Sequence, residues 1–239
     1  MHRFYAHQED VGENSLIIRG DEAAHMRNAL RMKAGDEFIA LDGSGIDYTC
    51  TITSIAGIAE AYIIKREANL CEPAVKVTLY QAYPKLAKMN EIVQKAVELG
   101  AAAIVPFLSE RCVKRPFGQG EKLSRVALSA VKQSGRSVLP EVPDVQSFED
   151  ALARMKRHEQ LIVCWEEETQ ASLRGVLQTD AKDIGIVIGP EGGFETAEIE
   201  TMIAIGGDVV TLGRRIMRTE TAGIAVLAAV FYDKGQMQY

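Results

Sequence analysis

The sequence predicts an α/β protein in two parts: a small β-rich unit over residues 1–72 and a larger parallel-sheet unit over residues 73–239. Three observations predict this division. Short alternating apolar and polar runs dominate the first part, which is typical of small barrels. From residue 75, apolar strands alternate with amphipathic helices, which is the pattern of a parallel sheet. Pro73 marks the expected boundary between the two parts.

The first part contains five expected strands around one short helix. The strands are expected over residues 2–5, 15–19, 36–42, 48–55 and 59–66. The helix is expected from about Asp21, and Gly35 lies just past its end as a stop signal. Several short strands around a single helix favour a small β-barrel.

The second part largely alternates between strands and helices. Strands are expected over residues 75–82, 102–107, 160–165, 184–188 and 208–212. Helices are expected over residues 86–99, 121–134, 148–155, 195–205 and 222–232. Because strands joined through helices run in the same direction, their carboxyl ends should share one edge of the sheet.

Composition is that of an ordinary globular protein, with 47% apolar and 25% charged residues among 239. We expect a cytoplasmic protein, since no secretory signal or bilayer-spanning apolar run is found. The cysteines and histidines are dispersed without metal-ligand spacing, so we expect free thiols and no metal site. They are Cys50, Cys71, Cys112, Cys164, His2, His7, His25 and His158.

Charge is unevenly distributed along the chain. The net charge is −6, yet residues 111–136 carry seven basic side chains and only one acidic one, Glu121. A local basic field in an acidic protein suits contact with a phosphate backbone. The alternative is a solvated, salt-bridged helix surface.

A glycine-rich turn follows the expected strand of residues 184–188 and reads Gly189-Pro190-Glu191-Gly192-Gly193. Glycines at a strand end let backbone groups approach a ligand closely. A phosphate loop is not expected, because no Gly-Lys-Ser/Thr follows and Glu191 is negatively charged. A cofactor with hydroxyls, an amine or a positive centre fits better. The alternative is a tight turn that binds nothing.

A second polar segment follows the last expected strand. Residues 212–218 read L-G-R-R-I-M-R, and residues 219–223 read T-E-T-A-G and open the final helix. Thr219 could serve only as the N-cap of that helix, with Glu220 complementing its dipole. That interpretation leaves three nearby arginines without a role, so we expect a functional site here.

Short motifs that are typical of one protein family occur along the whole chain. They are R-F-Y at 3–5, H-x-x-x-x-L-R at 25–31, K-x-x-K-M-N-E-I-V-Q-K-A-V-E-L-G at 85–100, P-x-x-S-E-R at 106–111, Q-S-G-R-S-x-x-P at 133–140, G-P-E-G-G-F at 189–194 and L-G-R-R-I-M-R-T-E-T-A at 212–222. The set resembles the RsmE family of 16S ribosomal RNA uracil-N3 methyltransferases, of the SPOUT class. Departures from the family pattern are Lys132 for an acidic residue, Met217 for Leu and Glu195 for a Ser-type cap.

The resemblance implies a PUA-like N-terminal barrel and a C-terminal methyltransferase domain with a trefoil knot. It also implies a homodimer that acts on 16S ribosomal RNA in the small ribosomal subunit. The implied cofactor is S-adenosyl-L-methionine, held by three loops without a metal. The expected cofactor-binding residues are Cys164, Trp165, Glu166, Ile188, Gly189, Pro190, Glu191, Gly192, Leu212, Gly213, Ile216, Met217, Thr219, Thr221 and Ala222.

The implied reaction requires a proton to leave N3 of an unpaired uracil. We expect Arg218 to stabilise the uracil anion and Glu220 to orient it or act as base, with Glu191 as a second candidate base. The expected RNA-binding residues are Arg3, His25, Arg31, Lys88, Arg111, Arg115, Lys132 and Arg136. The alternatives are a SPOUT ribose 2′-O-methyltransferase and a non-catalytic RNA-binding assembly factor.

Overall fold

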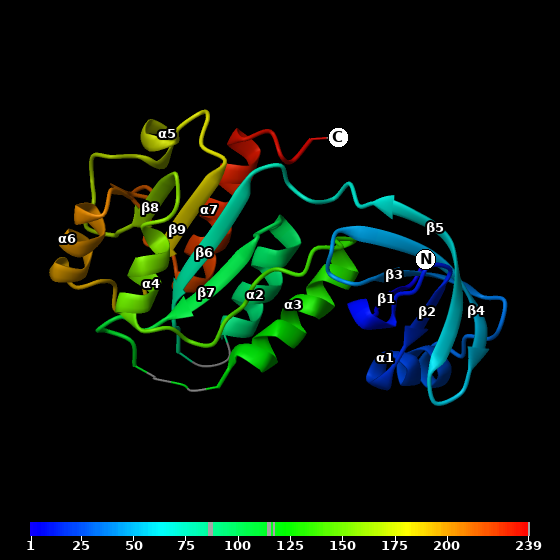
Figure 1. Ribbon diagram of the computed structural model, residues 1–239. Helices are drawn as coiled ribbons and strands as arrows, with labels where there is room; N and C mark the ends of the chain where they lie inside the picture. The colour runs from blue at the N-terminus through cyan, green and yellow to red at the C-terminus, as the bar shows by residue number, and fades with distance from the viewer. Residues whose placement is uncertain (86–87, 114–115, 117, 239) are drawn as a thin grey trace. The chain divides into compact units, whose positions relative to one another are not determined.

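The computed structural model describes residues 1–85, 88–113, 116 and 118–238. The chain divides into two compact units (Figure 1). One unit comprises Met1–Glu72 together with Leu128–Leu139, and the other comprises Pro73–Ala127 together with Pro140–Tyr239. Residues 128–139 therefore pack with the N-terminal unit, although they follow a long stretch of the other unit in sequence.

The N-terminal unit is built on one five-stranded sheet. Its strands, in spatial order, are β1 (Arg3–Tyr5), β3 (Glu37–Leu41), β4 (Ile46–Ile55), β5 (Ala59–Ala68) and β2 (Ser15–Ile18). β1 and β3 are parallel, whereas the other neighbours are antiparallel. The alternating burial along β4 and β5 places one face on the core, which is the pattern that predicted these strands.

A short helical segment completes the core of this unit. Helix α1 (Gly20–Ala24) continues directly as a π-helical turn (His25–Ala29), preceded in the chain by a 3-10 turn (Gln8–Asp10). Ala23 and Met26 pack into the core with strand residues such as Phe4 and Phe38, whose rings meet edge to face at 5.6 Å. The predicted helix is confirmed, but apolar spacing could not indicate that its second half is π-helical.

The C-terminal unit is built on a fully parallel sheet, as predicted. Its strands, in spatial order, are β10 (Gly207–Val210), β8 (Gln160–Cys164), β9 (Asp183–Ile188), β6 (Lys76–Ala82) and β7 (Ala103–Phe107). The central strands are buried almost throughout, because helices cover both faces.

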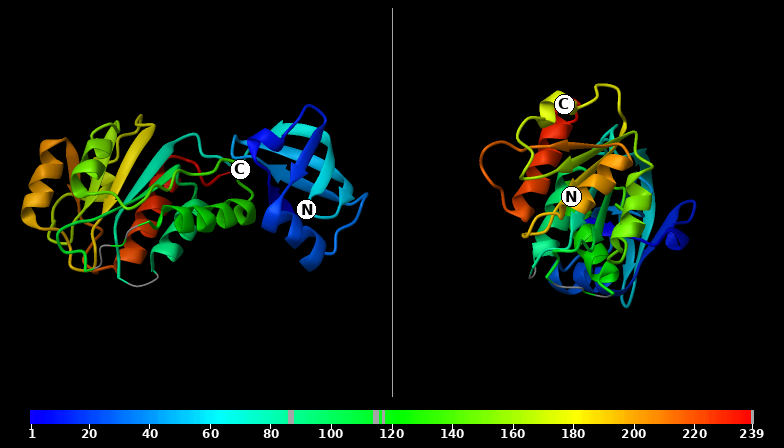
Figure 2. Two further views of the ribbon diagram at one scale, coloured as in Figure 1. Left: turned by 60° about the horizontal axis from the view of Figure 1, so that its bottom comes forward. Right: turned by 90° about the vertical axis from the view of Figure 1, so that its left-hand side faces the viewer.

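Helices α2 (Lys88–Leu99) and α7 (Thr219–Asp233) pack against each other on one face of this sheet, and α7 also contacts β6 and β9. Helices α4 (Phe148–Met155) and α6 (Thr196–Ala204) lie on the opposite face (Figure 2). The remaining helices are α3 (Gly120–Ser134) and α5 (Leu173–Val176). No helix within the described ranges is both long and apolar enough to cross a bilayer.

The strand order brings three connecting segments together. β9 lies between β6 and β8, and the chain then passes beyond β8 to β10. Because these strands are parallel, the segments after β8, β9 and β10 leave the same edge of the sheet. We call them the first loop (165–172), the second loop (189–195) and the third loop (211–218). The expected trefoil knot concerns how these segments thread and stays a prediction.

Candidate active site

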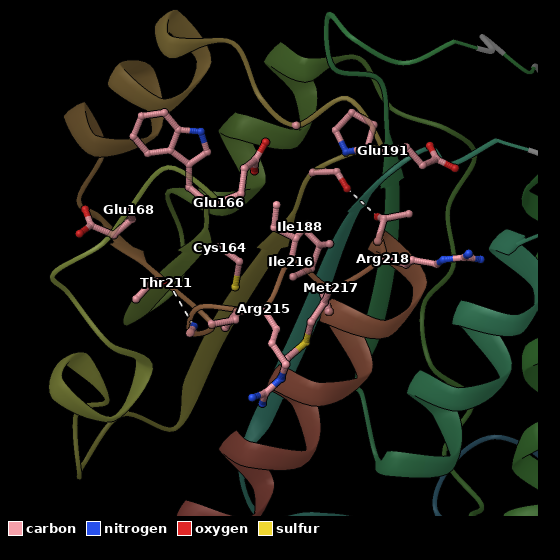
Figure 3. Close-up of a pocket in the computed structure, with 18 of the residues that line it drawn as sticks. Cys164, Glu166, Glu168, Ile188, Glu191, Thr211, Arg215, Ile216, Met217 and Arg218 are labelled. Carbon is pink, nitrogen blue, oxygen red and sulfur yellow. Dashed lines mark hydrogen bonds between the residues drawn. The ribbon is translucent and has the colours of Figure 1, made fainter.

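A cavity of about 1020 Å³ opens where the three loops meet, at the upper end of the volume range of small-molecule sites. Apolar side chains lie at its centre, with Glu168 on one side and with Glu191 and Arg218 on the other (Figure 3). The lining residues are Lys88, Cys164, Trp165, Glu166, Glu168, Thr169, Ile188, Gly189, Pro190, Glu191, Gly192, Gly193, Thr211, Leu212, Gly213, Arg214, Arg215, Ile216, Met217, Arg218, Thr219 and Ala222.

The structure thus brings together nearly all of the residues expected to bind a cofactor. The exception is Thr221, which lies outside the lining and whose backbone N–H donates to the Arg218 carbonyl in the first turn of α7. Gly193, Arg214 and Arg215 also line the cavity, in segments where a site is expected, but without a predicted role of their own. Sequence reasoning missed Glu168, Thr169 and Thr211 altogether. Their common signal is their position in the first residues after a strand of a parallel sheet, where ligand-binding groups gather.

Thr219, the first residue of α7, links the second loop to strand β6 beside the cavity. Its hydroxyl donates a 2.6 Å hydrogen bond to the carbonyl oxygen of Gly189 and accepts a 2.8 Å bond from Nε2 of Gln81 on β6. Gln81 is fully buried. The N-cap of α7 is Arg218, so the interpretation of Thr219 as a simple N-cap is wrong.

The second loop requires glycine for geometric reasons. Gly193 has a φ of +68°, and a Cβ there would lie 1.8 Å from Oε1 of Glu166 in the first loop. Arg111 braces the same loop, since its guanidinium donates to the Gly192 carbonyl at 2.9 Å and to Glu195 at 2.7 Å. Glu195 in turn forms a capping box with Glu198 at the start of α6. The loop is therefore held from both ends.

Ionised side chains gather beside the cavity. Lys88, Glu191 and Arg218 line it, whereas the predicted catalytic residue Glu220 is not among the lining residues. Nζ of Lys88 lies 3.0 Å from Oε2 of Glu220 and 3.5 Å from Oε1 of Glu191. The Glu191 carboxylate also accepts hydrogen bonds of 3.0 and 3.2 Å from the Lys85 backbone N–H. Arg218 lies 4.0 Å from Oε1 of Glu220, and its side chain is 80% exposed.

The environment favours the charged forms of Lys88 and Glu220. Burial raises the pKa of the Glu220 carboxyl, but its own backbone N–H and Lys88 outweigh burial, and the net pKa lies below its ordinary value. The hydrogen bond to Glu220 raises the pKa of the Lys88 ammonium. Glu220 is thus ionised at neutral pH and accepts a proton less readily than an ordinary carboxylate.

The central walls of the cavity are apolar. Cys164 and Ile188 are buried at the ends of β8 and β9, and Ala222 closes the side formed by α7. Burial raises the pKa of the Cys164 thiol to about 12, so it stays protonated and acts as a small apolar side chain. Ile216 is 88% exposed at the rim. An apolar centre of this kind suits a flat aromatic ring.

The polar groups of the cavity suit the hydroxyls, the amine and the sulfonium of the expected cofactor, S-adenosylmethionine. Backbone groups of glycine turns can recognise the edge of a base, and carboxylates can accept from hydroxyls or attract an amine or sulfonium. Glu166, Glu168 and Glu191 provide such carboxylates. Trp165 Nε1 is buried without a hydrogen-bond partner within the described part of the chain. No group of three or more His, Cys, Asp or Glu side chains there could hold a metal ion.

Three basic residues expected to contact RNA are held in ion pairs within the N-terminal unit. Arg3 binds Asp47 at 2.5 Å and Ser137 at 2.6 Å. Arg136 binds Glu72 at 2.8 Å and is buried, with 4% of its side chain exposed. Lys132 pairs with Glu22. Neutralised, poorly exposed cations are unsuited to phosphates, so this geometry favours a structural role for all three.

The other expected RNA contacts are placed differently. His25 and Arg31 are exposed in the N-terminal unit, and Arg31 adopts φ 54°, which is uncommon for a residue other than glycine. Arg111 braces the second loop and Lys88 lines the cavity, as described above. Arg115 lies outside the described residues.

Comparisons with known proteins agree with this architecture. The family model for an RNA methyltransferase domain matches residues 71–231, and the model for an RNA methyltransferase PUA domain matches residues 18–59. Ribosomal RNA small subunit methyltransferase E of Bacillus subtilis is 33% identical over 231 residues, covering 92% of this chain and 90% of that protein. The protein of the same name from Synechocystis is 31% identical, covering 96% and 77% respectively.

The fold is also similar to solved structures. Ribosomal RNA small subunit methyltransferase E from Neisseria gonorrhoeae, bound to S-adenosyl methionine, superposes with a TM-score of 0.87 at 31% identity. The match covers 97% of each chain. The likeness therefore extends over both units and includes the sheet edge that carries the cavity.

Proposed function

Because this chain belongs to the ribosomal RNA small subunit methyltransferase E family, we propose that it methylates N3 of one uridine in 16S ribosomal RNA of the small ribosomal subunit. One observation carries the proposal: the three loops enclose a cavity whose rim combines arginine, lysine and carboxylate groups. In this proposal residues 73–239 form the methyltransferase domain, and residues 1–72 form a PUA-like RNA-binding domain. We place the reaction in the cytoplasm.

S-adenosylmethionine is the cofactor, and it supplies a methyl group on a positively charged sulfur for transfer to N3. The first, second and third loops would hold it through backbone groups, with Cys164, Ile188 and Ala222 against its apolar part. The cavity volume of about 1020 Å³ leaves room for a uracil beside the cofactor. Because N3 lies on the Watson–Crick edge, the target base must be unpaired to enter.

The protein must deal with the proton on N3. Arg218 stabilises the negative charge that spreads onto the uracil carbonyls as the proton leaves. Its guanidinium is exposed and 4.0 Å from Glu220, so it is available to a substrate. Glu220 orients Arg218 or accepts the proton, and Glu191 is the second candidate base. The low pKa of Glu220 favours the orienting role.

RNA binding is proposed to use the exposed cations rather than the buried ones. His25 begins the π-helical turn of the N-terminal unit, and Arg31, with its positive φ, follows that turn, so both lie in an unusual stretch of backbone. Arg111 would extend the contact near the second loop. Arg214 and Arg215 line the cavity and are exposed, so they would add positive charge to this RNA contact. Arg115 stays an expected RNA contact outside the described residues.

The proposed homodimer would use the outer face of α7. Ala228 is half-buried, Ala229 is exposed, and 72% of Tyr232 is exposed, although α7 already packs on α2 and the sheet. Small residues at such a face allow close helix contact, and an exposed tyrosine suits the centre of an interface. Sedimentation of the purified chain measures this directly.

The test compares wild-type, Arg218→Ala and Glu220→Ala proteins on small ribosomal subunits with radiolabelled S-adenosylmethionine. Loss of methyl transfer in both variants, with cofactor affinity unchanged by calorimetry, supports the assigned roles. Unchanged turnover in both removes them from the chemistry. Methylation at a ribose would instead support a 2′-O-methyltransferase, and RNA binding without turnover in the wild type would support an assembly factor.

A further inference from the structure

Lys88 joins two parts of the site that are far apart in sequence. It belongs to α2, and its ammonium lies between Glu191 of the second loop and Glu220 at the start of α7. A quarter of its side chain is exposed, and 16% of the Glu220 side chain is exposed. Among the described residues, this is the one place where α2, the second loop and α7 are linked by side-chain charges.

This arrangement differs from that of a phosphate-binding lysine. Carboxylate oxygens of Glu220 and Glu191 lie 3.0 and 3.5 Å from the Lys88 ammonium. Together they cancel the charge that a phosphate would need, whereas Arg214 and Arg215 are exposed in the lining of the same cavity. The geometry therefore separates Lys88 from the RNA-contacting cations.

The Glu220 carboxylate is oriented by this contact. One oxygen, Oε2, is held by Lys88 at 3.0 Å, so the other, Oε1, is directed toward Arg218 at 4.0 Å. Glu191 is fixed in the same way, because both of its oxygens also accept from the Lys85 backbone N–H. Without Lys88, the two carboxylates would lose the cation that links them.

We propose that Lys88 is a positioning residue of the methyl-transfer site, which ties Glu191 to Glu220 and fixes the Glu220 carboxylate, ionised, beside Arg218. The inference rests on the proposed function, because it assigns Lys88 to the chemistry of N3 rather than to RNA affinity. Lys88 does not itself remove the proton from N3, because its ammonium is held in the charged form by the two carboxylates.

The experiment compares Lys88→Met, which keeps the apolar stem, with Lys88→Arg, which keeps the charge. Lys95→Ala is the matched control, because Lys95 lies on the same helix, pairs with Glu98 at 2.9 Å and is not part of the cavity lining. We expect Lys88→Met to lower kcat at least tenfold with KM for RNA within twofold of wild type. Lys88→Arg should recover most of the loss, and Lys95→Ala should equal wild type.

Two further readouts distinguish positioning from RNA binding. The acid limb of the kcat–pH profile should move to higher pH in Lys88→Met, because the Glu220 carboxyl loses the cation that lowers its pKa. The salt dependence of RNA binding should not change. A slope reduced by about 0.7–0.9, which is the loss of one phosphate contact, with kcat intact would overturn the proposal.

A readout without turnover separates this proposal from the proposed function. In the free protein, NMR titration of carbon-13-labelled glutamate side chains should show the Glu220 pKa rising in Lys88→Met and not in Lys95→Ala. An unchanged Glu220 pKa contradicts the inference whatever reaction the enzyme catalyses. If Lys88→Met does not fold, Glu220→Gln removes the charge of the other partner of the same ion pair. The pKa of the Lys88 ammonium should then fall, because the Glu220 carboxylate raises it.

Discussion

The Thr219 hydroxyl donates to the carbonyl oxygen of Gly189 at 2.6 Å, so the first residue of α7, directly after the third loop, is joined to the first residue of the second loop. Gln81, fully buried on β6, supports this bond from below by donating to the same hydroxyl at 2.8 Å. The floor of the cavity is thus fixed by a chain of three residues whose positions in the sequence are 81, 189 and 219. We propose that this chain preorganises the cofactor site.

Thr219→Val should break this chain at its middle. The valine keeps the shape but leaves a buried amide N–H and a carbonyl without the hydroxyl partner, at a cost of about 1–3 kcal/mol. We expect cofactor affinity, measured by calorimetry, to fall roughly tenfold, since 1.4 kcal/mol corresponds to a factor of ten. Thr219→Ser keeps the hydroxyl and is the control. Equal affinities for the two variants would show that the hydrogen bonds do not shape the site.

Gly193→Ala should damage the site more than its backbone strain alone predicts. The alanine must adopt φ +68° and would also displace Glu166, because its Cβ would fall 1.8 Å from Oε1. Gly206→Ala is the matched control, with φ +95° and no atom within 4 Å of its Cβ. Both variants should lose about 1–2 kcal/mol of stability, whereas only Gly193→Ala should weaken cofactor binding. Similar cofactor affinities would remove Glu166 from the site.

Exposed and buried arginines of the N-terminal unit should behave oppositely. Arg31→Ala should leave the melting temperature unchanged and reduce the salt slope of RNA binding by about 0.7–0.9. Arg136→Ala should lower the melting temperature instead, because Glu72 would be left partly buried without its 2.8 Å partner. Filter binding across a salt series, paired with thermal unfolding, measures both. A folded Arg136→Ala protein with a reduced salt slope would return Arg136 to the RNA interface.

The Asp47 carboxylate should make the N-terminal unit sensitive to acid. Burial raises its pKa, but hydrogen bonds from Arg3, Ser137 and Asn69 outweigh burial, so its pKa in the folded protein lies below the ordinary value of 3.8. Because the pKa of this carboxyl is lower in the folded than in the unfolded protein, its ionisation stabilises the fold at pH values above the pKa of the unfolded state. This contribution is lost as the pH falls through the pKa of the folded state.

Asp47→Asn should therefore lower the unfolding free energy at pH 7 by about 1–3 kcal/mol and by less at pH 3. Urea unfolding at the two pH values tests this, and the exposed Glu200→Gln in α6 is the control. An Asp47→Asn penalty that stays constant or grows toward pH 3 would contradict the pKa direction.

Local patterns in the sequence were sufficient for most of the fold. Alternation of apolar strands with amphipathic helices predicted the parallel sheet, and the polar and glycine-rich segments after strands indicated where a site lies. The individual cofactor-binding residues came from the family resemblance. Local patterns could not predict which side chains far apart in the sequence form ion pairs or hydrogen bonds. Arg136 and Glu72 are 64 positions apart, and Arg3 and Ser137 are 134 apart, so a basic stretch in the sequence could not reveal that its charges are already neutralised. Gln81 was hidden for the same reason, because a single glutamine in an apolar strand carries no periodic signal.

The central claim is most directly tested by identifying the methylated nucleoside. Wild-type protein is incubated with small ribosomal subunits and isotopically labelled S-adenosylmethionine, and the 16S ribosomal RNA is digested and separated by chromatography with mass detection. With wild-type protein, the label should be found in N3-methyluridine at a single site. With Arg218→Ala, no label should be incorporated. Label in a 2′-O-methyl nucleoside, or no label with wild-type protein although the cofactor binds, would contradict the proposed function.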